Sequence, residues 1–241
     1  MRLQQFLAKA GVASRRKAES LIASGAVSVN GVAVTAAGSN VNPAKDRVSL
    51  EGRRLMIDEP IYRLILKPRA CLATLGPSGE RPTLKRYVRD AEPGLQVVAP
   101  LDFPAEGVLL LTTDGELAQA IAKPPRRTGG MPMTYHLKLQ GMVTEDEIER
   151  LLRGWTWEGR RVKPMAMDRL ATTDKNTWVE MVVAETRPRA LKAAGDLIRH
   201  SLLKISRTRL GGLSFEGLKM GAWRDLTKSE IADLRRRAGL E

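Results

Sequence analysis

The sequence is poor in residues that bind metals or form disulfides. Its 241 residues include one cysteine, Cys71, and two histidines. A lone cysteine forms no disulfide within the chain, and three such ligands do not make a zinc-type site. The phosphate-binding loop that ends in Gly-Lys-Ser/Thr is missing, as are Gly-x-Ser-x-Gly and paired histidine spacings. We therefore expect no structural metal and no P-loop hydrolysis.

Long apolar segments are also absent. No run of about 18 apolar residues occurs, so we expect no transmembrane helix. The first residues, Met-Arg-Leu-Gln-Gln-Phe, lack the apolar core of a signal peptide and are patterned like a helix. Because 43% of the residues are hydrophobic, a packed core is expected. These features together predict a cytoplasmic globular protein.

Acidic residues are too few to balance the basic ones. Forty Lys and Arg against 27 Asp and Glu give a net charge of +13. Basic residues concentrate in residues 1–58 and again in residues 186–211, where Asp196 is the single acid. Such concentrations fit a polyanion, because each phosphate contact releases counterions. No amphipathic helix has the strong apolar face that a membrane surface requires, which leaves nucleic acid as the expected partner.

The first 34 residues are patterned as two helices and a hairpin. Residues 2–10 place apolar side chains at helical spacing, and Gly11 ends that helix. Ser14 is a suitable N-cap for a second helix, which Gly25 ends. Residues 26–34 alternate around Asn30-Gly31, which is a strong hairpin signal.

Three cations, Arg15, Arg16 and Lys17, directly follow the predicted cap. In a first helical turn they oppose the helix dipole, but such a turn is well suited to hold a phosphate. An ordinary solvated charge run is the alternative. The full pattern of residues 1–48 resembles the S4-type RNA-binding module, named after the fourth protein of the small ribosomal subunit. The resemblance implies that Arg2, Arg15, Arg16 and Lys17 contact folded RNA.

Turn-forming pairs between residues 40 and 60 place a domain boundary near residue 58. We therefore expect a small domain over residues 1–58 and a larger one over 59–241. In the larger domain, apolar or alternating segments predict strands at 61–66, 95–101, 107–112, 134–139, 178–183 and 202–209. Helices are expected at 114–122, 144–154, 188–198 and 227–237, and capping boxes open the second and the last. The predicted fold class is α+β, with a mixed, mostly antiparallel sheet flanked by helices.

An acidic loop lies between two of the expected strands. Residues 99–107 read Ala-Pro-Leu-Asp-Phe-Pro-Ala-Glu-Gly and include Asp102 and Glu106. Loops held by buried strands often carry catalytic groups. An Asp before Phe-Pro is also an ordinary turn former. Asp102 is therefore a candidate catalytic residue, with a structural turn as the alternative.

The surroundings of Asp102 resemble the RsuA-type pseudouridine synthases. The resembling segments keep the family's order and are residues 67–68, 101–102, 106–112, 114–117, 134–138, 176–178, 185–189, 207–211 and 218–227. The resemblance covers nearly the whole chain. It implies isomerisation of a uridine within structured RNA, without cofactor or metal. The expected RNA partner is ribosomal RNA or a ribosome assembly intermediate. We expect the protein to act as a monomer.

The resemblance also implies roles for individual residues. Asp102 corresponds to the catalytic aspartate, which acts as nucleophile or base while the glycosidic bond breaks. Tyr135 corresponds to the tyrosine that packs against the base, and Lys192 to the cation that pairs with the aspartate. A core aromatic and a solvated helix residue are the respective alternatives. Further RNA contacts of this domain are expected from Lys67, Arg187, Arg189, Arg207 and Arg209.

Several positions near the expected site depart from the family pattern. They are Leu66, Ala70, Pro100, Ala105 and Met133, where the family usually has asparagine, glycine, arginine, threonine and lysine. Two interpretations therefore stay open. The first is a divergent, active synthase that acts on ribosomal RNA. The second is a catalytically weak or inactive RNA-binding paralogue that acts in ribosome assembly or as an RNA chaperone.

Overall fold

The computed structural model describes the chain except at residues 14, 37, 44, 58, 90, 123–129, 185–186 and 241, and without side chains at 15 and 16. Two compact units are present: residues 1–60 with 92–94, and residues 61–91 with 95–241. Each unit has its own cluster of buried apolar side chains. Within the described residues, no helix has the length and apolar character needed to cross a membrane.

The first unit contains two helices and a four-stranded sheet. Helices α1 (Leu3–Lys9) and α2 (Arg15–Ala23) pack against each other, and the strands lie in the order β2-β1-β3-β4. The strands are β1 (Val27–Val29), β2 (Val32–Ala33), β3 (Val48–Leu50) and β4 (Arg53–Arg54). Asn30 and Gly31 have φ of 52° and 84°, as a two-residue turn between β1 and β2 requires. The predicted helix-helix-hairpin order is confirmed, and a second antiparallel pair, β3 with β4, adds to it.

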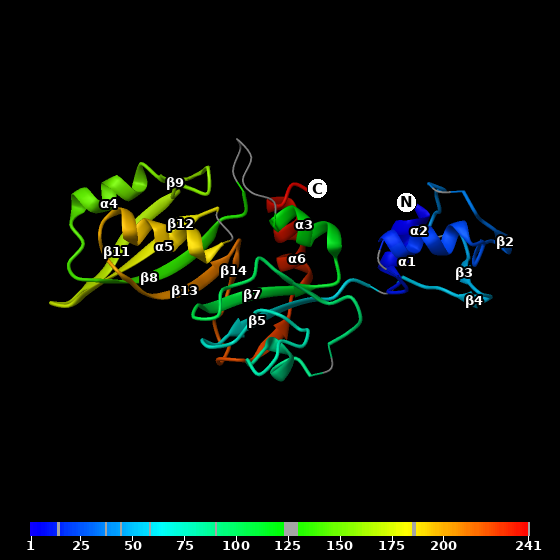
Figure 1. Cartoon of the computed structure of the whole chain (residues 1–241), viewed down its shortest axis with the longest axis horizontal. Coiled ribbons are helices and arrows are strands. Elements are labelled where there is room, and N and C mark those ends of the chain that lie inside the picture. Colours follow the sequence, from blue (N-terminus) through cyan, green and yellow to red (C-terminus); the bar gives the residue numbers. More distant parts are fainter. Residues whose placement is uncertain are drawn as a thin grey trace. The chain divides into compact units, whose positions relative to one another are not determined.

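The second unit is built on a nine-stranded sheet (Figure 1) with the order β11-β12-β8-β13-β7-β5-β15, to which β14 and β6 add at β13 and β7. The strands are β5 (Tyr62–Lys67), β6 (Gln96–Val98), β7 (Glu106–Thr112), β8 (Met133–Gln140), β11 (Ala166–Thr172), β12 (Asn176–Val183), β13 (Leu202–Leu210), β14 (Leu213–Ser214) and β15 (Trp223–Asp225). Only β13 and β7 pair in parallel among these described strands. The sheet is therefore mixed and mostly antiparallel, which confirms the predicted α+β class.

Helices and one small hairpin accompany this sheet. The helices are α3 (Gly115–Ala122), α4 (Glu145–Leu152), α5 (Pro188–Leu197) and α6 (Lys228–Arg237), with a 3-10 turn at Leu84–Arg86. Strands β9 (Trp155–Trp157) and β10 (Arg160–Val162) form a separate antiparallel pair. Helix α5 contacts both β9 and β13, so it joins the hairpin to the sheet.

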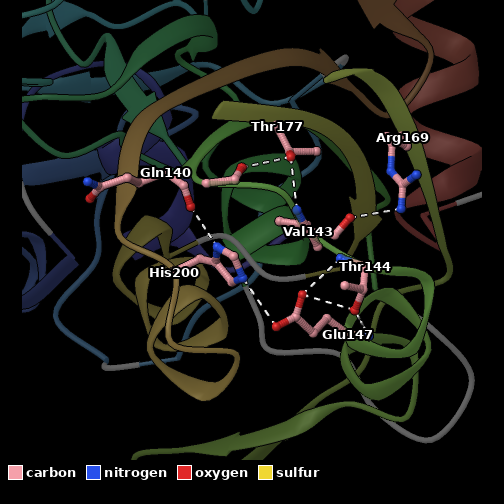
Figure 2. A network of polar contacts seen from close by, with 8 residues as sticks. Gln140, Val143, Thr144, Glu147, Arg169, Thr177 and His200 are labelled. Atoms are coloured by element: carbon pink, nitrogen blue, oxygen red, sulfur yellow. Dashed lines mark hydrogen bonds and ion pairs between the residues drawn. The ribbon is translucent and has the colours of Figure 1, made fainter. Parts of the chain in front are cut away.

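A polar network fastens the start of α4 to the sheet (Figure 2). The Thr144 side chain accepts from the Glu147 N–H, and the Glu147 carboxylate accepts from the Thr144 N–H, as the predicted capping box requires. The His200 ring nitrogens lie 2.6 Å from the Gln140 carbonyl oxygen and 3.2 Å from Glu147 Oε1. Burial opposes ionisation of Glu147, but the hydrogen bonds from Thr144 and His200 outweigh it and lower the pKa of this carboxyl. Thr177 completes the network by donating to the Gly141 carbonyl.

Candidate active site

Asp102 lies on the loop between β6 and β7, and two buried cations hold both ends of that loop. Arg207 on β13 donates from one guanidinium nitrogen to the Ala99 carbonyl, 2.8 Å away. The Lys67 Nζ at the end of β5 donates to the Ala105 carbonyl over 2.6 Å. Between these two points the Asp102 side chain is 38% exposed. The loop is therefore fixed at its ends while its carboxylate stays accessible.

The approach of β7 to β13 makes this arrangement possible. Gly107 pairs with Arg207 in the parallel register and has φ of 124°. A Cβ at Gly107 would lie 2.2 Å from the Arg207 carbonyl oxygen, so no other residue fits there without displacing a strand. The Arg207 Nε also donates to the Val108 carbonyl at 2.9 Å, which locks the side chain beneath the loop.

Lys67 and Arg207, two of the predicted RNA contacts, are both buried in this structure. Neither residue has exposed surface, and most of their nitrogens donate to main-chain carbonyls. Burial lowers the pKa of Lys67 to about 8, and the nearby Cys71, Asp102 and Glu106 offset this only in part. The two cations support the loop, and their contact with RNA stays a prediction.

Tyr135 on β8 lies opposite Arg207 in the sheet register. It has no exposed surface, and its hydroxyl donates to the Met133 Sδ at 3.5 Å. An Arg207 guanidinium nitrogen lies 3.4 Å from the same sulfur. The alternative of a core aromatic therefore describes its position here, and its contact with a base stays a prediction.

The cation next to Asp102 is Arg189, not Lys192. The Arg189 Nε lies 4.0 Å from Asp102 Oδ2. Lys192 is exposed on α5, and in the described part of the chain it forms no ion pair with Asp102. In this structure Arg189 therefore occupies the place expected of Lys192, whose pairing with Asp102 stays a prediction. The reason is that Arg189 lies in the first turn of α5, at the end that borders the loop.

A cavity of about 340 Å³ opens beside Asp102, and residues from three segments line it. The loop contributes Pro100 and Asp102, the β9–β10 hairpin contributes Trp157 and Glu158, and the start of α5 contributes residues 187–189. The Arg187 guanidinium carbon lies 4.4 Å from the centre of the Trp157 ring. Trp157 and Glu158 were not predicted as site residues. The alternating Trp-Thr-Trp followed by Glu-Gly is a hairpin pattern that could have indicated these residues. In the structure, Glu158 and Gly159 form the turn of that hairpin, and both have positive φ.

The remaining predicted RNA contacts are distributed over both units. Arg2, Lys17 and Arg209 are exposed, and Arg2 also donates to the Gly38 carbonyl at 2.7 Å. The side chains of Arg15 and Arg16 fall outside the described part of the structure. No cluster of three potential metal ligands occurs among the described residues.

Comparison with known proteins places this chain in a family. Residues 1–48 match the S4 domain. An uncharacterized RNA pseudouridine synthase from Aquifex aeolicus is 34% identical over 100% of this chain and 96% of its own length. The ribosomal large subunit pseudouridine synthase B of Bacillus subtilis is 32% identical over 97% of this chain and 95% of its own.

A solved structure agrees with these relatives. The crystal structure of a pseudouridylate synthase is 26% identical and superposes with a TM-score of 0.63, covering 97% of this chain and 99% of that one. The sequence relatives exceed 30% identity over nearly their whole lengths. The chain therefore belongs to the RsuA-type RNA pseudouridine synthases, and it binds RNA through its S4 domain.

Proposed function

We propose that this enzyme converts a uridine of ribosomal RNA to pseudouridine, with Asp102 as its catalytic residue. The observation that carries the proposal is the half-exposed Asp102 carboxylate at the edge of a cavity, on a loop anchored by Lys67 and Arg207. The Bacillus subtilis relative, named for the large ribosomal subunit, supports ribosomal RNA as the substrate class.

The reaction moves one glycosidic bond from nitrogen to carbon. The bond between the ribose C1′ and uracil N1 breaks, the base turns within the site, and a bond forms between C1′ and C5. Asp102 acts as nucleophile or base during these steps. The proton on C5 is lost to water and N1 gains one, so the overall change is an isomerisation. Arg189, 4.0 Å from the carboxylate, attracts its negative charge.

The two units divide the work in this proposal. Residues 1–58 bind folded RNA through Arg2, Arg15, Arg16 and Lys17, while residues 59–241 carry out the isomerisation. In the second domain, the exposed cations Arg189 and Arg209 are suited to phosphate contacts because they lie outside the buried core. Phosphate contacts position the RNA without reading its sequence, so the identity of the uridine must come from shape and from unpaired bases.

Two departures from the family pattern are compatible with activity. Ala105 accepts the hydrogen bond from Lys67 with its main-chain carbonyl, which a residue of any type would supply at that position. Met133 places its sulfur between the Tyr135 hydroxyl and the Arg207 guanidinium. Both substitutions therefore leave the supports of the loop in place, which favours the active enzyme over the inactive paralogue.

Pseudouridine mapping in total RNA tests the proposal. A strain without the gene is compared with the parent and with strains that express the wild-type protein or Asp102→Asn. We expect one or a few ribosomal uridines to lose modification, and only the wild-type protein to restore it. An unchanged ribosomal map, or full restoration by Asp102→Asn, would contradict the substrate class or the catalytic residue respectively.

A further inference from the structure

The β9–β10 hairpin places an aromatic side chain beside the candidate catalytic residue. Trp155, at the start of β9, donates from its indole nitrogen to the Ala190 carbonyl of α5 at 2.9 Å. This buried bond fixes the hairpin on α5 without involving Trp157. Trp157 is only partly buried and lines the same cavity as Asp102. Trp157 thus packs against the edge of the buried apolar cluster and leaves part of its ring at the wall of the cavity.

Trp157 carries a planar cation on its ring. The Arg187 guanidinium carbon lies 4.4 Å from the ring centre, within the range of a cation–π contact. A second guanidinium atom lies 3.6 Å from the Glu158 carboxylate, at the turn of the same hairpin. Indole, guanidinium and carboxylate thus lie next to one another at the wall of the cavity, and we call them the Trp157 platform (Trp157, Glu158 and Arg187).

We propose that the Trp157 platform stacks an unpaired nucleobase that neighbours the target uridine, as a second nucleotide subsite. The inference rests on the proposed role of Asp102. An enzyme that acts on a base takes that base out of the stack, which leaves its neighbour without a stacking partner. Aromatic rings and arginine planes are the surfaces on which proteins stack unpaired RNA bases. The platform offers both within the cavity that contains Asp102.

Charge favours a base over a phosphate at this position. Glu158 lies beside Arg187 and its negative charge repels a phosphate that would approach the guanidinium. The same carboxylate, 64% exposed, retains acceptor capacity for an amino group on a base edge. Arg189 is 79% exposed, against 34% for Arg187, so it is the more accessible of the two guanidinium groups and is better placed for phosphate.

Replacing Trp157 tests the inference, with a second arginine-covered tryptophan as matched control. Arg63 lies 4.3 Å from the ring centre of Trp223, which does not line the cavity. Full-length wild-type, Trp157→Ala, Trp157→Phe and Trp223→Ala proteins are compared on a transcript of large-subunit ribosomal RNA labelled with tritium at uracil C5. Tritium release gives kcat and KM, and filter binding at several salt concentrations gives affinity.

We expect Trp157→Ala to raise KM and weaken binding by about five- to 150-fold, the range for loss of one stacked base. The value of kcat should stay near that of the wild type, Trp157→Phe should recover most of the affinity, and Trp223→Ala should behave like the wild type. Because stacking releases no counterions, the salt dependence of binding should be unchanged in Trp157→Ala.

Two outcomes would overturn the inference. Equal affinities of Trp157→Ala and Trp223→Ala would show that no base stacks on the platform. A fall in kcat at unchanged KM would assign Trp157 a structural role that acts through α5. If the wild type released no tritium, the ribosomal substrate would be wrong, and the binding comparison alone would still decide whether Trp157 contacts RNA.

Discussion

Lys67 and Arg207 hold the loop that positions Asp102. A buried cation is costly unless its donors are paired. Here the donors point at the carbonyls of Ala99 and Ala105, at the two ends of the loop that contains Asp102. Hydrogen bonds from charged groups are the stronger kind, at about 1.5–3 kcal/mol each. The two cations therefore restrict the loop without touching the carboxylate.

Replacing Lys67 by methionine should impair turnover more than stability. Methionine keeps the aliphatic volume and removes a charge whose burial is unfavourable, but the Ala105 carbonyl loses its donor. A displacement of the loop by about 1 Å can lower kcat by roughly 100-fold. Tritium release and urea unfolding measure the two effects. Lys138→Met, at a lysine of β8 that lies over the Trp178 ring, is the control and should leave kcat unchanged. Equal kcat values for Lys67→Met and the wild type would contradict the role of Lys67.

The cation beside Asp102 gives a second prediction for single residues. Arg189→Met should lower turnover more than Lys192→Met, because Arg189 is the one that lies 4.0 Å from the carboxylate. Since both side chains are exposed, the effect on folding stability should be within about 0.5 kcal/mol. Initial rates at saturating RNA compare the two variants. A larger loss in Lys192→Met would show that the lysine replaces Arg189 when RNA binds.

Capping boxes and turns were the elements best predicted from the sequence. Thr144 with Glu147 and Thr227 with Glu230 form reciprocal side-chain and backbone bonds at the starts of α4 and α6. These local signals work because all partners lie within four residues. The sequence did not predict the edge strand β11, because the five residues after Met167 are all exposed and give no alternation of buried and exposed positions. Pairing with β12 makes this segment a strand.

Glu230 gives a prediction for an element, the helix α6. Its carboxylate accepts from Arg224, 2.6 Å away, and from the Thr227 N–H, and these bonds lower its pKa to about 2. Since the unfolded pKa is about 4.3, the stabilisation is complete above that pH and is lost as the pH falls toward 2. Glu230→Gln should therefore destabilise the protein by about 1–2 kcal/mol at neutral pH.

Urea unfolding at several pH values checks this prediction. The difference between wild type and Glu230→Gln should shrink steadily between about pH 4.3 and pH 2. Glu216→Gln, at an exposed position, is the control and should match the wild type throughout. A difference that does not depend on pH would mean that the charge of Glu230 is not what stabilises the start of α6.

At the scale of the whole molecule, the sequence was enough to place the RNA-binding module and the loop with Asp102 but not to show which cations are buried. Arg207 is buried, while Arg209, two residues away on the same strand, is exposed. Residue type and local sequence therefore do not reveal that Lys67 and Arg207 are buried. Their donors are satisfied by carbonyls that lie 38 and 108 residues away. Such partners depend on the assembled sheet and leave no local signal.

The two separate cores predict that the second unit folds without the first. Buried apolar clusters form independently within residues 1–60 and in the rest of the chain. A protein that comprises residues 59–241 should therefore unfold cooperatively, bind structured RNA more weakly, and retain kcat at saturating RNA. Circular dichroism, filter binding and tritium release measure these properties. Unchanged affinity would mean that the S4 domain contributes nothing to binding of that RNA, and a folded protein without turnover would place part of the site in residues 1–58.

Tritium release by Asp102→Asn tests the central claim most directly. Asparagine keeps the size and most hydrogen bonds of the side chain but removes the nucleophilic carboxylate, so turnover should fall by orders of magnitude. Binding through phosphates should be nearly unchanged. Asp174→Asn, at an exposed turn, is the matched control and should be fully active. If Asp102→Asn released tritium from ribosomal RNA as fast as the wild type, Asp102 would not be the catalytic residue.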